Sequence, residues 1–119
     1  MADFNVGFVI FPGITQLDFT GPFEVLSRLG TPPSISVPST FPQAKTHVVA
    51  KTMQPMVSDR GLGIMPTCTF DSSPPLDLIC VPGGAGVLEA LTDAETVDFM
   101  RHQGERARYV TAVCVGAFL

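Results

Sequence analysis

The sequence has little charge, and most of that charge is acidic. Only 15% of its 119 residues are charged, with 7 Lys and Arg against 11 Asp and Glu, so the net charge is -4. A basic field that would attract nucleic acid or an anionic membrane is missing, and we expect neither partner. Disordered chains combine low hydrophobicity with high net charge, whereas 45% of these residues are hydrophobic. We therefore expect a chain that folds around a core.

Long apolar runs and regularly spaced cysteines are also absent. No run approaches the roughly 18 apolar residues of a membrane-spanning helix, and Met1-Ala2-Asp3 lacks the basic residues that open a signal peptide. Three cysteines, Cys68, Cys80 and Cys114, are widely spaced and odd in number. This pattern predicts neither a disulfide framework nor a zinc site, and a reducing cytoplasm is the simplest setting.

Four short apolar runs predict the strands of a sheet. They cover residues 4–11, 46–50, 76–81 and 109–113. Near-continuous apolar runs are typical of parallel strands that are covered on both faces. Residues 55–69 alternate short β-like pieces with glycine and proline, which indicates a small β-hairpin. Residues 31–43, rich in Pro, Ser and Thr, predict a long surface loop.

Two helices are expected between these strands. Thr20-Gly21-Pro22 resembles a helix start with Thr20 as the N-cap, and Gly30 would end that helix. Thr92 and Glu95 form a capping box for a second helix that runs to about residue 105 or 106. Strands separated by helices predict βαβ units with right-handed crossovers, and therefore an α/β fold with a parallel sheet.

The strongest chemical signal is Cys114, at the end of the last predicted strand. A small residue lies two positions away on each side, Ala112 and Gly116. A nucleophile elbow, a sharp strand-to-helix turn with a strained central residue, needs such small neighbours. A helix N-terminus favours a negatively charged group, including a thiolate. The alternative is a buried structural cysteine at a strand end.

Two other segments follow predicted strands and could serve the same site. Consecutive glycines in residues 82–86 allow Gly83 and Gly84 to turn their N–H groups toward a ligand, and with the N–H of Val115 they would form an oxyanion hole. Asp18 could exchange a proton with Cys114 if their strands are neighbours; the alternative is a helix cap. His47 lies in mid-strand and His102 on a charged helix face, so neither is expected to partner Cys114.

Together these motifs resemble the ThiJ/PfpI superfamily, and within it the isonitrile (isocyanide) hydratase branch. The resemblance rests on Phe8 to Pro12, Gln16 to Pro22, Asp77 to Gly84 and Ala112 to Gly116, in that order along most of the chain. It implies a flavodoxin-like sandwich related to class I glutamine amidotransferases, a homodimer, a small-molecule substrate and no cofactor or metal. It also implies that Cys114 is the nucleophile, that Asp18 is its acidic partner, and that Gly84 and Val115 supply backbone contacts.

The residue after the cysteine distinguishes the branches of this superfamily. Its proteases usually have His there, so Val115 argues against a cysteine protease. Hydratases often have Thr there; Val115 keeps the shape but lacks the hydroxyl. Two alternatives to a hydratase remain open. One is the ligand-sensing domain of an AraC-type regulator, which has the same fold, and the other is a redox-sensing thiol.

The length completes the prediction. Cys114 lies five residues from Leu119, and the helix and strands that normally follow an elbow have no residues to form them. We therefore expect residues 1–119 to be a single incomplete domain, the N-terminal portion of one about twice as long. The remainder would lie beyond residue 119 or be a separate chain.

Overall fold

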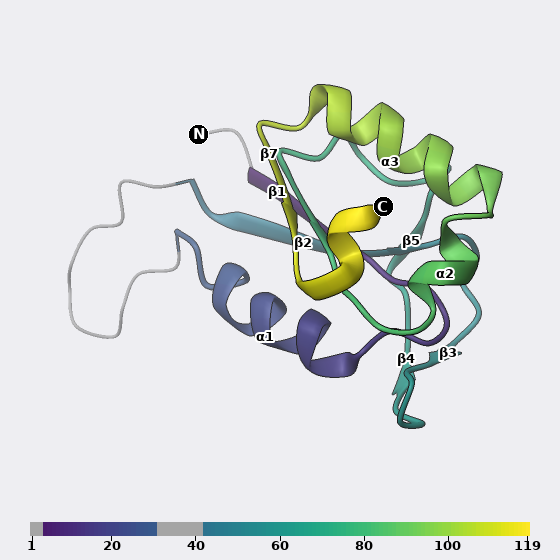
Figure 1. The fold of residues 1–119 in the computed structure, drawn as a ribbon. Helices are drawn as coiled ribbons and strands as arrows, with labels where there is room; N and C mark the ends of the chain where they lie inside the picture. Colours follow the sequence, from purple (N-terminus) through teal and green to yellow (C-terminus); the bar gives the residue numbers. More distant parts are fainter. Residues whose placement is uncertain (1–3, 31–41) are drawn as a thin grey trace.

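A computed structural model describes residues 4–30 and 42–119, and these residues form a parallel sheet with helices on both faces (Figure 1). The five-stranded sheet has the order β5-β2-β1-β6-β7, and all its strands are parallel. The strands are β1 (Phe4–Val9), β2 (Ala44–Ala50), β5 (Cys68–Thr69), β6 (Leu78–Val81) and β7 (Tyr109–Ala112). The predicted α/β fold is thus confirmed.

The apolar runs become the centre of the sheet, as expected. β6 is buried along its whole length, and β1 is buried at all positions but one. Burial on both faces explains why these runs show no alternation of polar and apolar residues. β7 differs because all four of its residues are exposed, on the open edge of the described sheet.

Helix α1 (Gln16–Leu26) covers one face of the sheet. Phe19 and Phe23 pack against Phe8 of β1, with ring centroids 6.0 and 5.1 Å from the Phe8 centroid. The prediction that the helix begins at Thr20 was wrong, because Thr15 is the N-cap and Pro22 lies inside the helix. Proline is favoured in the first turn, which made Pro22 a misleading signal.

The other face carries α2 (Val87–Ala90) and the longer α3 (Ala94–Arg106). The predicted end of α3 is confirmed, but Thr92 is not its N-cap. Asp93 has that role, because its carboxylate accepts hydrogen bonds from the N–H and the hydroxyl of Thr96. Phe99 of α3 stacks on Phe70, with the ring centroids 4.5 Å apart.

The predicted hairpin is present but shorter than expected. β3 (Met56–Val57) and β4 (Gly63–Ile64) pair antiparallel, and we call residues 56–64 the hairpin. Cys68, which the sequence placed in this hairpin, lies instead in β5 and pairs with β2 of the main sheet. Most of the predicted loop at residues 31–43 lies outside the described residues.

Candidate active site

The turn after β7 has the geometry of a nucleophile elbow. Cys114 has φ 54°, and it is the one non-glycine residue with positive φ in the described part of the chain. A 3-10 helix, η1 (Cys114–Phe118), follows at once. Left-handed backbone at a residue other than glycine is uncommon and is concentrated at functional sites. The cysteine is exposed at the tip of the turn.

One of the two small neighbours of Cys114 is explained by packing. Gly116 is buried against the end of β6, where an added Cβ would collide with the carbonyl oxygens of Val81 and Pro82. Any side chain at Gly116 would therefore push the elbow away from the sheet. Ala112 is exposed, so the described residues show no matching constraint on that side.

Gly83 is the point at which the predicted site residues meet. A Cβ at Gly83 would lie 2.9 Å from Asp18 Oδ2, 2.9 Å from Cys114 Cβ and 3.1 Å from the nitrogen of Val115. Because Gly83 has no side chain, the Asp18 carboxylate and the Cys114 elbow can both approach it. Gly83 is also a hydrogen-bond donor here, since its N–H lies 3.3 Å from Asp18 Oδ2.

This meeting point does not require neighbouring strands. β6 lies between β1 and β7, so the strands that precede Asp18 and Cys114 are not neighbours, which was the condition stated for their proton exchange. Asp18 and Cys114 instead approach each other over the end of β6. Chain connections leave β1 toward β2 on one side and leave β6 toward β7 on the other, which makes the carboxyl end of β1 and β6 a topological switch point. Open parallel sheets bind ligands in such crevices.

Backbone contacts hold the loops of the site together. The N–H of Thr15 donates to the carbonyl oxygen of Gly83 at 2.9 Å, and the N–H of Asp18 donates to the carbonyl oxygen of Thr15 at 3.0 Å. Gly84, with φ 124°, packs so closely that a Cβ would lie 2.5 Å from the oxygen of Gly13 and the nitrogen of Thr15. No local pattern pointed to the role of Thr15, because Gly83 lies in another loop.

The other titratable candidates lie away from this edge. His47 is half-buried in β2, its Nε2 is 3.0 Å from Asn5 Oδ1, and burial, with the charge of Lys45, lowers its pKa. Burial raises the pKa of the Cys68 and Cys80 thiols, which keeps them protonated. His102 is exposed on α3. None of these groups is placed to assist Cys114.

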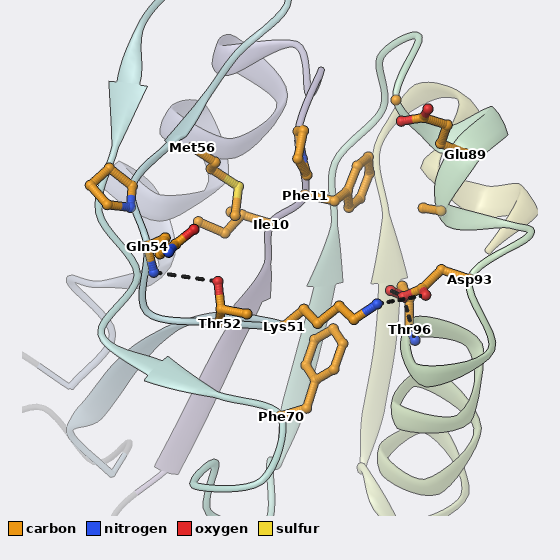
Figure 2. A pocket seen from close by; sticks show the side chains of 14 residues that line it. Ile10, Phe11, Lys51, Thr52, Gln54, Met56, Phe70, Glu89, Asp93 and Thr96 are labelled. Carbon is orange, nitrogen blue, oxygen red and sulfur yellow. Dashed lines mark hydrogen bonds and ion pairs between the residues drawn. The ribbon is translucent and has the colours of Figure 1, made fainter.

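A pocket of about 310 Å³ opens elsewhere along the carboxyl edge of the sheet (Figure 2). Phe11, Met56 and Phe70 supply apolar walls, and Lys51 Nζ binds Asp93 Oδ1 at 2.9 Å. Neither Asp18 nor Cys114 lines this pocket, and no cysteine does. We therefore do not place a cysteine-dependent reaction there.

Among residues 4–30 and 42–119, no three His, Cys, Asp or Glu side chains gather closely enough to bind a metal ion. Within the same residues, no helix has the length and apolarity to cross a bilayer.

Comparisons with known proteins agree with this architecture. The model of the DJ-1/PfpI family matches residues 5–119. The chain is 45% identical to isonitrile hydratase from Pseudomonas putida over 97% of its own length and 45% of that protein. It is 31% identical to the transcriptional regulator GbdR from Pseudomonas aeruginosa, over 96% of its own length and 29% of the regulator.

Solved structures give the same result. A THiJ/PfpI family protein from Pseudomonas syringae matches with a TM-score of 0.84 and 39% identity, over 98% of this chain and 44% of that one. DJ-1beta from Drosophila melanogaster, at 20% identity, matches with a TM-score of 0.76 over 98% of this chain and 58% of that one, and shows the shared fold. The chain thus spans about half the length of these relatives or less. With the family model matched almost from end to end, the chain belongs to the DJ-1/PfpI family, with its flavodoxin-like α/β fold related to class I glutamine amidotransferases.

Proposed function

We propose that this chain is the N-terminal portion of an isonitrile hydratase, a cysteine-dependent enzyme that converts isonitriles to N-substituted formamides. The observation that carries the proposal is the convergence of the Cys114 elbow and the Asp18 carboxylate on Gly83. The 45% identity to the isonitrile hydratase of Pseudomonas putida supports the choice of substrate class.

The proposed reaction starts at the sulfur. The thiolate of Cys114 attacks the terminal carbon of the isonitrile, and the carbon receives a proton from Asp18, which gives a thioimidate. Water adds to the carbon of this thioimidate, and one of its protons goes to the nitrogen. The C–S bond then breaks as the remaining hydroxyl proton returns to Asp18. The products are the N-substituted formamide and the free thiolate, so the net change is the addition of one water.

Asp18 is suited to the proton transfers by its position. Asp18 Oδ2 and Cys114 both lie next to the place that a Cβ would occupy at Gly83. The Asp18 side chain is half-buried at the start of α1. A carboxyl at this point can pass a proton to a substrate carbon that is bound to the Cys114 sulfur. The nitrogen of Val115 would lie 3.1 Å from a Cβ at Gly83, and we infer that its N–H stabilises the oxygen of the tetrahedral intermediate.

The test uses the full-length protein with an alkyl isonitrile and follows formamide formation. Cys114→Ala should lower kcat by about a thousand-fold or more, since it removes the bond-forming atom. Asp18→Asn should lower kcat by about a hundred-fold or more, the usual range for a lost general acid. Cys68→Ser, which changes a half-buried thiol in β5, is the matched control and should keep activity. No turnover by the wild type, or equal turnover by Cys114→Ala, would refute the proposal.

A second function is supported by the regulator relative. The 31% identity to GbdR covers almost the whole of this chain, so a ligand-sensing domain of an AraC-type regulator fits the same residues. The discriminating observation is the sequence of the complete protein. A helix-turn-helix region after this domain would favour the regulator, and its absence would favour the enzyme.

A further inference from the structure

Thr15 is the N-cap residue of α1, yet its side chain does not cap the helix. An N-cap threonine normally accepts a hydrogen bond from the N–H two or three residues further on. Here the N–H of Asp18 is bound by the backbone carbonyl of Thr15 instead. The Thr15 hydroxyl donates to Asp59 Oδ2 at 2.8 Å, 44 residues away in the hairpin. The side chain therefore connects two elements.

A second side-chain link runs beside the first. The hydroxyl of Ser58, which is only 5% exposed, donates to Gln16 Oε1 at 2.6 Å. Ser58 Oγ also accepts hydrogen bonds from the N–H groups of Arg60 at 3.3 Å and Leu62 at 3.0 Å, so the hairpin turn fixes the direction of this hydroxyl. A buried hydroxyl with these partners cannot rotate freely, and it holds Gln16 in one place.

Two backbone hydrogen bonds complete the connection. The N–H of Asp59 donates to the oxygen of Ile14 at 2.8 Å, and the N–H of Gly13 donates to the oxygen of Val57 at 3.1 Å. The hairpin is thus attached at four points to residues 13–16, immediately before Asp18. Two-stranded hairpins are marginal by themselves, so the attachment orders both partners.

Thr15 also connects the attached segment to the candidate active site. Its N–H binds the oxygen of Gly83 at 2.9 Å, and its own carbonyl oxygen binds the N–H of Asp18 at 3.0 Å. A displacement of Thr15 would therefore move the carboxylate and the loop that the carboxylate contacts. Misplacing a catalytic group by about 1 Å can cost about a hundred-fold in rate.

We propose that the hairpin positions Asp18 relative to Cys114, and that Thr15, Ser58 and Asp59 are positioning residues for this site. The residues make no contact with the reacting atoms and act through the start of α1. The catalytic consequence rests on the proposed function, whereas the effect on the reactivity of Cys114 does not.

The first test compares Thr15→Val with Thr15→Ser in the full-length protein. Valine keeps the shape of the side chain and loses the hydroxyl; serine keeps the hydroxyl. We expect Thr15→Val to lower kcat by about ten-fold or more with little change in KM, because orientation is lost and substrate contacts remain. Thr15→Ser should restore kcat to nearly the wild-type value. An equal loss of kcat in both variants would overturn the proposal.

The second test needs no turnover. The rate of alkylation of Cys114 by iodoacetamide is measured against pH, with the modified site identified by mass spectrometry. If Thr15 positions Asp18, Thr15→Val should shift this profile in the same direction as Asp18→Asn, since both changes disturb the carboxylate that meets the Cys114 elbow at Gly83. An unchanged profile in Thr15→Val, beside a shifted one in Asp18→Asn, would contradict the proposal. An inactive wild type would refute the proposed function and leave this comparison valid.

Two further variants distinguish a loss of positioning from a general loosening of the fold. Ser58→Ala removes the other side-chain link and should shift the alkylation profile in the same direction as Thr15→Val. Ser72→Ala is its matched control, because that hydroxyl also accepts a backbone N–H, from Thr69, but in the turn after β5. A shift in Ser72→Ala as large as that in Ser58→Ala would show general loosening and would overturn the proposal.

Discussion

At the scale of single residues, the backbone conformation of Cys114 lowers the stability of the fold. Its φ of 54° lies in the left-handed region, which costs a residue with a Cβ about 1–2 kcal/mol. Such strain persists only where the surroundings impose it. Here Gly116 packed on β6 and the hydrogen bond from the N–H of Val113 to Val81 O (2.9 Å) hold the turn.

This strain predicts an unusual order of stabilities. Cys114→Gly should be more stable than Cys114→Ala by about 1 kcal/mol, because glycine adopts positive φ without strain and this outweighs its larger unfolded-state entropy. Urea denaturation of the two full-length variants measures the difference. The matched pair is Val113→Gly and Val113→Ala, at φ -118°, where glycine should be the less stable. A Cys114→Ala variant as stable as Cys114→Gly would show that the elbow is unstrained.

Residue types and strand ends predicted the members of the site, but not how they meet. Cys114, Asp18 and Gly83 each follow an apolar run, and parallel strands bring their carboxyl ends to one edge. The order of the strands has no local signature, so the position of β6 between β1 and β7 could not be foreseen. The links of Thr15 and Gln16 to the hairpin were missed for the same reason, since their partners Asp59 and Ser58 lie more than 40 residues away in the sequence.

At the scale of elements, the helix starts were the hardest features to predict. Apolar runs in the sequence predict the strands. The start of a helix, in contrast, depends on which of several polar side chains accepts a hydrogen bond from a backbone N–H of the first turn. Thr92 was the predicted N-cap of α3, but its hydroxyl donates to Glu89 O at 2.8 Å, and Asp93 caps the helix. Asp93 also binds Lys51, so its carboxylate joins α3 to the end of β2.

The role of Asp93 gives a prediction about pH. Hydrogen bonds from Thr96, together with Lys51, lower the pKa of Asp93 from its ordinary value of 3.8. A lowered folded-state pKa means that the carboxylate stabilises the fold above about pH 4, and that this contribution is lost as the pH falls further. Asp93→Ala should therefore have a lower Tm than the wild type at neutral pH, with the difference shrinking below about pH 4.

Thermal denaturation monitored by circular dichroism measures this difference. Thr92→Ala is the control, since its hydroxyl bonds only to the carbonyl of Glu89 in the preceding turn; it should change the Tm less than Asp93→Ala does. A difference between wild type and Asp93→Ala that stays constant from neutral to acid pH would contradict the assignment.

At the scale of the whole molecule, the two edges of the sheet differ. β5 ends the sheet as a two-residue strand, which protects that edge by its shortness. β7 ends the other side with Tyr109 and Val110 exposed by 44% and 60%, and η1 adds Phe118 at 72%. Exposed apolar side chains along the outer edge of an edge strand form a surface that another strand can cover. The chain spans 45% of the isonitrile hydratase relative, and we propose that further polypeptide covers the β7 edge.

This proposal predicts how residues 1–119 behave by themselves. The isolated segment should associate in a concentration-dependent way in sedimentation velocity and bind the dye ANS, because the β7 edge and Phe118 are uncovered. Val110→Lys, which puts a charge on the edge strand, should reduce both signals while leaving the far-ultraviolet circular dichroism unchanged. Met65→Lys is the matched control, a side chain 62% exposed in the segment that leads from β4 into β5, the opposite edge strand, and it should have little effect. If the isolated segment is monomeric and binds no dye, the β7 edge needs no covering. If Met65→Lys acts as strongly as Val110→Lys, added charge alone accounts for the change, and the β7 edge is not the associating surface.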